Sequence, residues 1–98
     1  MPDEKKTFPR IVPDQCEREG PKATIVIDCA SMEQAYDMKT REIALNYAKS
    51  EYGMGRSGFS NNGSVEWVNE HGDLLRGEAF QAAKTRIVRV SYPIQEGL

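Results

Sequence analysis

The sequence contains few of the residues that build membrane spans, disulfide scaffolds or metal sites. Its longest uninterrupted aliphatic run covers only residues 25–27, far short of the roughly 20 apolar residues that a transmembrane helix needs. Its two cysteines, Cys16 and Cys29, and its single histidine, His71, are too few for a four-ligand zinc site or a disulfide scaffold. No metal, no cofactor and no contact with a membrane are therefore expected.

The N-terminal residues also lack the apolar stretch of a secretory signal. Two cysteines in a chain with an ordinary hydrophobic fraction of 39% are typical of free thiols in a reducing compartment. The sequence therefore predicts a cytoplasmic protein.

A strong charge of either sign is absent as well. Thirteen Lys and Arg residues stand against fifteen Asp and Glu, which gives a formal net charge of −2. Eight basic and ten acidic residues precede Gly53, and five of each kind follow it. Nucleic-acid-binding domains usually carry a strongly basic surface. The charge therefore argues against binding to DNA or RNA.

The 98 residues have room for one domain, and its N-terminal part differs from the rest. Residues 1–22 contain four of the five prolines, which favour extended or irregular backbone. Phe8 and Ile11 give this stretch apolar side chains that can contact a core or a second subunit. We predict an extended, proline-containing arm over residues 1–22 and a single α+β domain over residues 23–98.

Strands are predicted wherever β-branched residues gather. These segments are residues 23–29, 64–69 and 85–92. A hairpin turn is expected at residues 70–73, with a further strand beginning near Leu74. Residues 75–84 are ambiguous, because helix-forming residues are interrupted by Gly77.

One long helix is predicted over residues 32–52, which contain no Gly or Pro. Ser31 and Gln34 have the spacing of a helix capping box. Gly53 suits the left-handed conformation that often ends a helix.

These elements predict a two-layer α+β sandwich, in which one long helix covers a three- or four-stranded, mainly antiparallel sheet. If residues 75–84 form a strand, the order is a βαβββ meander, which we favour. If they form a helix, the order is ferredoxin-like βαββαβ. Neither order by itself indicates a function.

Apolar residues fall on two sides of the predicted helix when they are placed at 100° steps. The stripe expected to face the core consists of Met32, Ala35, Tyr36, Ile43 and Tyr47. A second stripe of Met38, Leu45 and Tyr52 lies nearly opposite. Tyr and Met are enriched where proteins touch, so this second stripe is predicted to contact a partner, together with Phe8 and Ile11 of the arm. Coverage by the arm itself and simple exposure are the alternatives.

The segment from Gly53 to Gly58 reads as a literal GxGxxG. In a dinucleotide-binding fold this motif follows a strand and begins a helix, whereas here it follows the predicted helix. A glycine-rich backbone can still bind an anion through its N–H groups. The candidate ligand-binding residues are Gly53, Gly55, Arg56, Ser57 and Gly58.

No pattern of residues indicates catalysis. A thiolate at Cys29 would be favoured by the helix that follows, but a cysteine enzyme also needs a base, and His71 falls in a predicted hairpin turn. We predict no catalytic residues and slow alkylation of Cys29.

The sequence therefore predicts a small non-catalytic protein-binding domain that acts as a homodimer or as a subunit of a larger complex. The alternative is a module that binds an anion, a phosphate-bearing ligand or nucleic acid through the Gly53–Gly58 loop.

Overall fold

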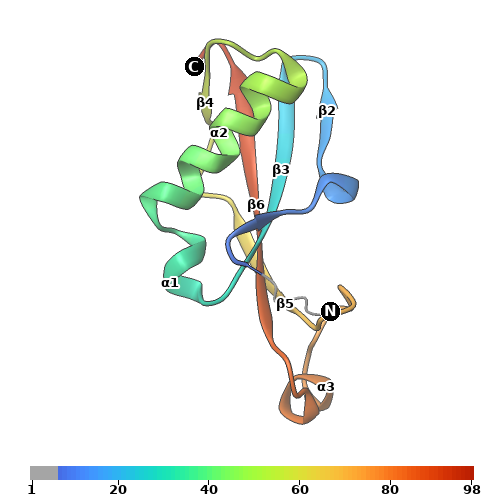
Figure 1. Ribbon diagram of the computed structural model, residues 1–98. Coiled ribbons are helices and arrows are strands. Elements are labelled where there is room, and N and C mark those ends of the chain that lie inside the picture. The colour runs from blue at the N-terminus through green and yellow to red at the C-terminus, as the bar shows by residue number, and fades with distance from the viewer. Residues whose placement is uncertain (1–6) are drawn as a thin grey trace.

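The computed structural model describes residues 7–98 and shows an α+β fold with an open, six-stranded antiparallel sheet and three helices (Figure 1). The strands are β1 (Arg10–Ile11), β2 (Glu17–Glu19), β3 (Lys22–Cys29), β4 (Ser57–Phe59), β5 (Ser64–Val68) and β6 (Ile87–Glu96). The helices are α1 (Met32–Ala35), α2 (Met38–Tyr52) and α3 (Glu78–Ala82), with a short 3-10 helix at Pro13–Gln15. The predicted α+β class is confirmed, but the sheet is larger than expected and the helix is not single.

β3 and β6 form the centre of the sheet. They pair antiparallel from Lys22 opposite Gln95 to Cys29 opposite Val88. β1 and β2 pair with the other edge of β3, and β4 and β5 pair with the other edge of β6. Because β4 and β5 pair with β6 and, within the described residues, not with each other, the chain follows neither the βαβββ meander nor the ferredoxin-like order.

The predicted N-terminal arm is built into the sheet from β1 onward. β2 and β3 form a hairpin in which Glu19 lies opposite Lys22, and Gly20 in the turn takes a φ of +61° that glycine adopts readily. The Cys16 thiol adds a link, because it accepts a hydrogen bond from the Val26 N–H at 3.2 Å. The first six residues of the predicted arm lie outside the described residues.

The ends of the predicted helix agree with the structure. Ser31 Oγ accepts a hydrogen bond from the Gln34 N–H at 3.1 Å, and the Gln34 side chain accepts one from the Ala30 N–H at 2.7 Å. Gly53 takes the left-handed conformation after α2, with a φ of +66°. These local signals lie within a few residues of each other in the sequence.

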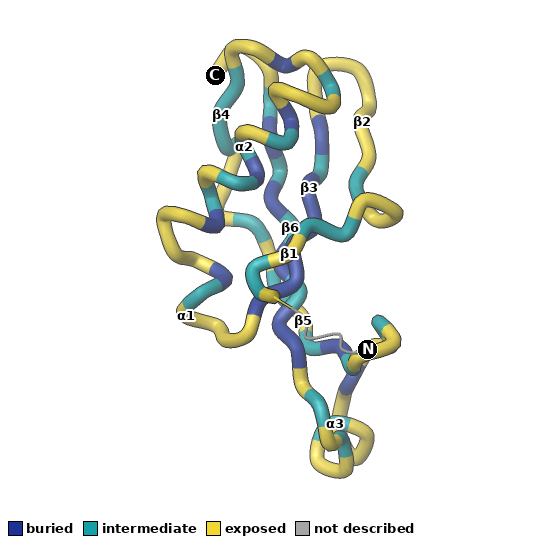
Figure 2. Tube along the Cα trace, in the orientation of Figure 1, coloured by how far each residue is buried: buried dark blue, intermediate teal, exposed yellow. Residues whose placement is uncertain are grey.

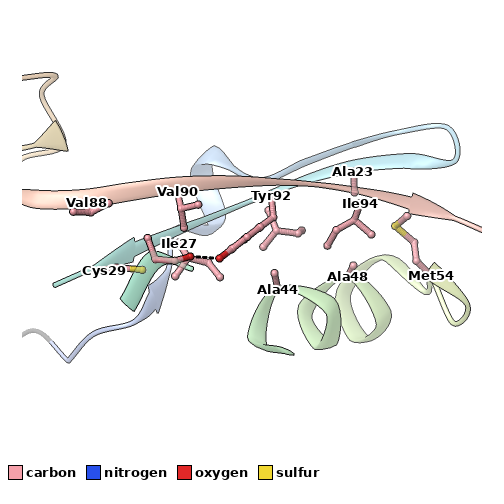
Figure 3. Close-up of a cluster of buried hydrophobic side chains, with 12 residues drawn as sticks. Ala23, Ile27, Cys29, Ala44, Ala48, Met54, Val88, Val90, Tyr92 and Ile94 are labelled. Carbon is pink, nitrogen blue, oxygen red and sulfur yellow. Dashed lines mark hydrogen bonds between the residues drawn. The ribbon is translucent and has the colours of Figure 1, made fainter. Parts of the chain in front are cut away.

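The predicted single helix over residues 32–52 is wrong, because the chain breaks it into α1 and α2. The Thr40 hydroxyl donates to the Gln34 carbonyl at 2.7 Å, and the Tyr92 hydroxyl donates to the Ala35 carbonyl (dashed in Figure 3). These side chains satisfy carbonyl groups that a continuous helix would bond internally. The interruption therefore depends on contacts with the second helix and with β6.

The two predicted helix stripes are also corrected. α2 faces the sheet through the small residues Thr40, Ala44 and Ala48, which are completely buried. Leu45 and Tyr52 flank this buried row and pack against the core. The centre of the contact thus falls between the two predicted stripes, where small side chains allow α2 to approach the sheet closely.

The two faces of the sheet differ in character. The face covered by α1 and α2 carries the hydrophobic core, in which β3 and β6 contribute alternate residues (Figure 3). Figure 2 shows that β3 and β6 are mostly buried, whereas β2 and the outer side of α2 are exposed. The opposite face is not covered by a helix within the described residues (Figure 1).

The connection from β5 to β6 extends beyond the two-layer body to α3 (Figure 1). The predicted hairpin turn is present, because the Asn69 N–H donates to the Asp73 carbonyl at 2.9 Å. The strand expected after it is reduced to an isolated bridge between Val68 and Leu74. Residues 75–84 contain the short helix α3, so the strand that we favoured there is wrong.

Candidate interaction surface

Exposed apolar side chains gather at α1 and the first residue of α2. Met32 and Tyr36 are each 40% exposed, and Met38 is 70% exposed. Within the described residues, they are three of the five large hydrophobic side chains that are exposed; the others are Leu74 and Leu98. We call Met32, Tyr36 and Met38 the α1 patch.

The local fold explains why these side chains stay outside the core. In α1 the residue that faces the core is Ala35, which is completely buried and held by Tyr92. α2 begins at Met38, but its buried row begins only at Thr40. The backbone of the α1 patch is therefore held against the core at Ala35, while its large side chains lie outside the core.

A pocket of about 590 Å³ lies at the same end of the molecule. We call it the end pocket, and it is lined by Phe8, Ala30, Glu70, His71, Thr85, Arg86 and Ile87. Ala30 joins β3 to the cap of α1, and the Gln34 side chain of α1 donates to the Phe8 carbonyl at 3.4 Å. The end pocket and the α1 patch are therefore neighbours in the fold.

The residues predicted to contact a partner do not form one continuous surface. Met38 is 70% exposed, and Phe8 is half-buried at the end pocket. Ile11, Leu45 and Tyr52 are partly buried and pack against the core. Met32 and Tyr36, which were expected in the core, are exposed like Met38, and Ala35 is the buried residue of α1.

The Gly53–Gly58 loop is tied to the protein through its backbone. The N–H groups of Gly53 and Met54 both donate to the Ala48 carbonyl, and the Gly55 N–H donates to the Gly53 carbonyl. An anion-binding nest needs successive N–H groups that point at the ligand, and these three already have partners. Met54 is also completely buried in the core.

The remaining loop residues lie apart from such a nest. Arg56 is exposed, and its carbonyl accepts a hydrogen bond from the Gly97 N–H at 2.7 Å. Ser57 and Gly58 belong to β4 and pair with β6. The loop is therefore a helix end that leads directly into a strand.

Cys29 faces the core rather than solvent. It is completely buried, and burial raises the pKa of its thiol to about 11, with the carboxylate of Asp28 adding to the rise. A thiolate at neutral pH is therefore disfavoured, contrary to the effect expected from the following helix. His71 lies in the exposed hairpin turn, where it pairs with Glu70 at 3.6 Å.

The uncovered sheet face contains an ion pair that the sequence did not reveal. Asp28 is only 2% exposed, and Arg89 on the neighbouring strand donates to both of its carboxylate oxygens, at 2.8 and 3.1 Å. Arg10 of β1 lies 3.7 Å from the same carboxylate. This pairing raises the pKa of Arg89. Asp28 and Arg89 are 61 residues apart, so no local signal could have found them.

The uncovered face also lacks the aromatic side chains that sheets use to stack nucleic-acid bases. The register places Phe59, Trp67 and Tyr92 on the helix-covered side, with the buried row of β6. The residues of β3 and β6 on the other side include Thr24, Ser91 and Pro93. This face offers no stacking platform within the described residues.

Comparisons of the chain with protein-family models, with curated proteins and with solved structures find no match. Within residues 7–98, no helix is long and apolar enough to cross a membrane, and no three acidic, cysteine or histidine side chains come together as a metal site.

Proposed function

We propose that this chain is a small non-catalytic protein-binding domain, which acts in the cytoplasm as a homodimer or as a subunit of a larger complex. The observation that carries this proposal is the α1 patch, in which Met32, Tyr36 and Met38 are exposed within seven consecutive residues. Scattered apolar residues are ordinary on a protein surface, whereas neighbouring ones mark interaction sites.

The chemistry and the rigidity of the α1 patch both suit a protein contact. Met and Tyr are enriched at interfaces, and complete burial of a fully exposed Met side chain contributes about 1.5–3 kcal/mol. The bonds from Thr40 and Tyr92 to the end of α1 hold its backbone in place. A preorganised surface loses less conformational entropy when it binds.

The test compares association of the wild-type chain with that of Met38→Asp. An acidic residue in the first turn of a helix interacts favourably with the helix dipole, and this position is exposed, so the variant should fold. Leu74→Asp is the matched control, because Leu74 is 42% exposed but lies outside the α1 patch. Sedimentation velocity over a range of concentrations measures self-association, and capture by the immobilised chain measures binding of other proteins.

We expect the wild-type chain and Leu74→Asp to associate with the same partner and Met38→Asp to lose that association. Equal association of all three chains, or none by any of them, would contradict the proposal.

The alternative remains a module that binds an anionic ligand through Gly53, Gly55, Arg56, Ser57 and Gly58. If phosphate or a nucleotide raises the melting temperature of the chain and Arg56→Ala abolishes the rise, this alternative gains over protein binding. The bonds already made by the N–H groups of residues 53–55 lead us to expect no such rise.

A further inference from the structure

At one end of the sheet, the start of β6 has no neighbouring strand on the β3 side within the described residues. β3 accompanies β6 only as far as Cys29 opposite Val88, and Ile87 pairs with Val68 of β5 on the other side. After Cys29 the chain turns at Ala30 into α1. The sheet position that β3 would occupy beside the start of β6 therefore holds no strand within residues 7–98.

The backbone along this vacancy is unpaired. Within the described residues, Lys84, Thr85 and Arg86 share no hydrogen bond with another backbone group. Free N–H and C=O groups beside a strand are a template for pairing with a further extended chain. The end pocket lies along this same segment, since Thr85, Arg86 and Ile87 line it.

The end pocket has an apolar part and a polar part that is already paired. Phe8, Ala30 and Ile87 supply the apolar lining. The Glu70 carboxylate accepts a hydrogen bond from the Thr85 hydroxyl at 3.2 Å and lies 3.6 Å from His71. An apolar side chain can therefore enter without leaving this carboxylate unpaired.

The charge on the other side of this segment is positive. Neighbouring residues of an extended chain point to opposite faces, so Arg86 lies on the face opposite to Ile87. Its guanidinium stacks over the Phe80 ring at 4.4 Å and donates to the Phe80 and Gln81 carbonyls. Among residues 7–98, no carboxylate pairs with this cation. An acidic side chain on an adjacent strand would complement it.

The edge of the sheet formed by β1 and β2 is much less suited to such pairing. β2 consists of Glu17, Arg18 and Glu19, all exposed, and charged side chains are a common protection of edge strands. β1 has only two residues, and Pro9 and Pro13 lie on either side of it. The segment of residues 84–87 has no proline and borders a pocket.

We propose that the end pocket binds an extended segment of a partner protein, which is added as an antiparallel strand and pairs with the backbone of Lys84 and Arg86, the residues that face the β3 side. An apolar side chain of that segment enters between Phe8, Ala30 and Ile87, and an acidic side chain beside it faces Arg86. This inference rests on the proposed protein-binding function and names the chemistry of the partner.

The experiment titrates the isotope-labelled full chain with the capped peptide acetyl-Thr-Val-Glu-Val-Thr-amide and follows backbone amide signals by NMR. We expect shifts concentrated at residues 84–87 and at Ala30. The same peptide with an N-methylated glutamate, which cannot donate the backbone hydrogen bond to the Arg86 carbonyl, should cause none. The peptide with Lys in place of Glu should bind about 1.4-fold to fivefold more weakly, since cross-strand charge pairs contribute about 0.2–1 kcal/mol each.

Two variants test the location. Ala30→Trp should fill the end pocket and abolish the shifts, while Asn62→Trp places the same side chain on an exposed loop elsewhere and should leave them unchanged. If Ala30→Trp does not fold, Lys84→Pro removes one backbone donor that faces the vacant position and should weaken binding instead. Shifts that survive N-methylation, shifts at other residues, or none at all would overturn the proposal.

The Met38→Asp variant separates this inference from the proposed function. It should bind the peptide as the wild-type chain does, because Met38 does not line the end pocket. If the peptide fails to bind while Met38→Asp still abolishes association of the whole chain, strand addition is wrong and the protein-binding function stands.

Discussion

Methionine and tyrosine occur in two regions of this molecule with opposite roles. In the core, Met54 and Tyr92 are almost completely buried between α2 and the sheet (Figure 3). In the α1 patch, Met32, Tyr36 and Met38 are at least 40% exposed. The same residue types therefore stabilise the fold in one region and are not needed by it in the other. Apolar residues that the fold does not need are the basis of the proposed contact.

The largest expected effect is in the core. Met54→Ala removes a completely buried side chain and should lower the free energy of unfolding by about 2–5 kcal/mol, because lost burial and a residual cavity add together. Urea denaturation followed by circular dichroism measures this. A loss below about 1 kcal/mol, less than the range for such truncations, would place Met54 outside the core.

The buried carboxylate of Asp28 tests whether a buried polar side chain contributes to stability as a buried apolar one does. Asp28→Ala leaves Arg89 without its carboxylate partner and should cost about 3 kcal/mol, at the lower end for a broken buried pair, because Arg89 keeps some contact with solvent. Arg10→Ala is the control, since its side chain is largely exposed and its contact is longer. It should cost less than about 1 kcal/mol. Equal losses for both variants would contradict this account of the uncovered face.

The buried thiol of Cys29 should make the fold sensitive to alkaline pH. Its pKa rises from 9.0 to about 11 in the folded chain, so the folded state holds a proton that the unfolded state releases. This contribution to stability is complete below pH 9 and should be lost as the pH rises toward 11. We expect Cys29 to react with iodoacetamide slowly at neutral pH and after Cys16, which is only partly buried. Faster reaction at Cys29 would show that it is not shielded.

The smallest effect on stability is expected in the α1 patch. Met38→Ala removes a side chain that is 70% exposed and should change the free energy of unfolding by no more than about 0.5 kcal/mol. The same denaturation experiment used for Met54→Ala measures it, so the two methionines form a matched pair. A loss comparable to that of Met54→Ala would show that the fold needs the α1 patch.

Local signals in the sequence predicted local structure well. Ser31 and Gln34 form the predicted helix cap, and Gly53 takes the predicted left-handed conformation. Each of these features depends on residues close together in the chain. The strands β3 and β6 were predicted for the same reason, from short runs of β-branched residues.

Features that depend on distant contacts were missed. The break between α1 and α2 rests on bonds from Thr40 and Tyr92, and the second of these links residues 57 positions apart. Without that break, Met32 and Tyr36 were assigned to the core and Leu45 to the surface. The Asp28–Arg89 pair likewise depends on the register between β3 and β6. The α1 patch could therefore be recognised only once these contacts were known.

The most direct test of the α1 patch is NMR of the chain with 13C-labelled methionine methyl groups. Met32 and Met38 report on the α1 patch, and Met54 reports on the core. As the protein concentration rises, or when extract of the producing cells is added, the methyl signals of Met32 and Met38 should shift or broaden. The Met54 signal should stay unchanged. If Met32 and Met38 remain unaffected under both conditions, or if Met54 changes with them, the α1 patch is not the contact surface.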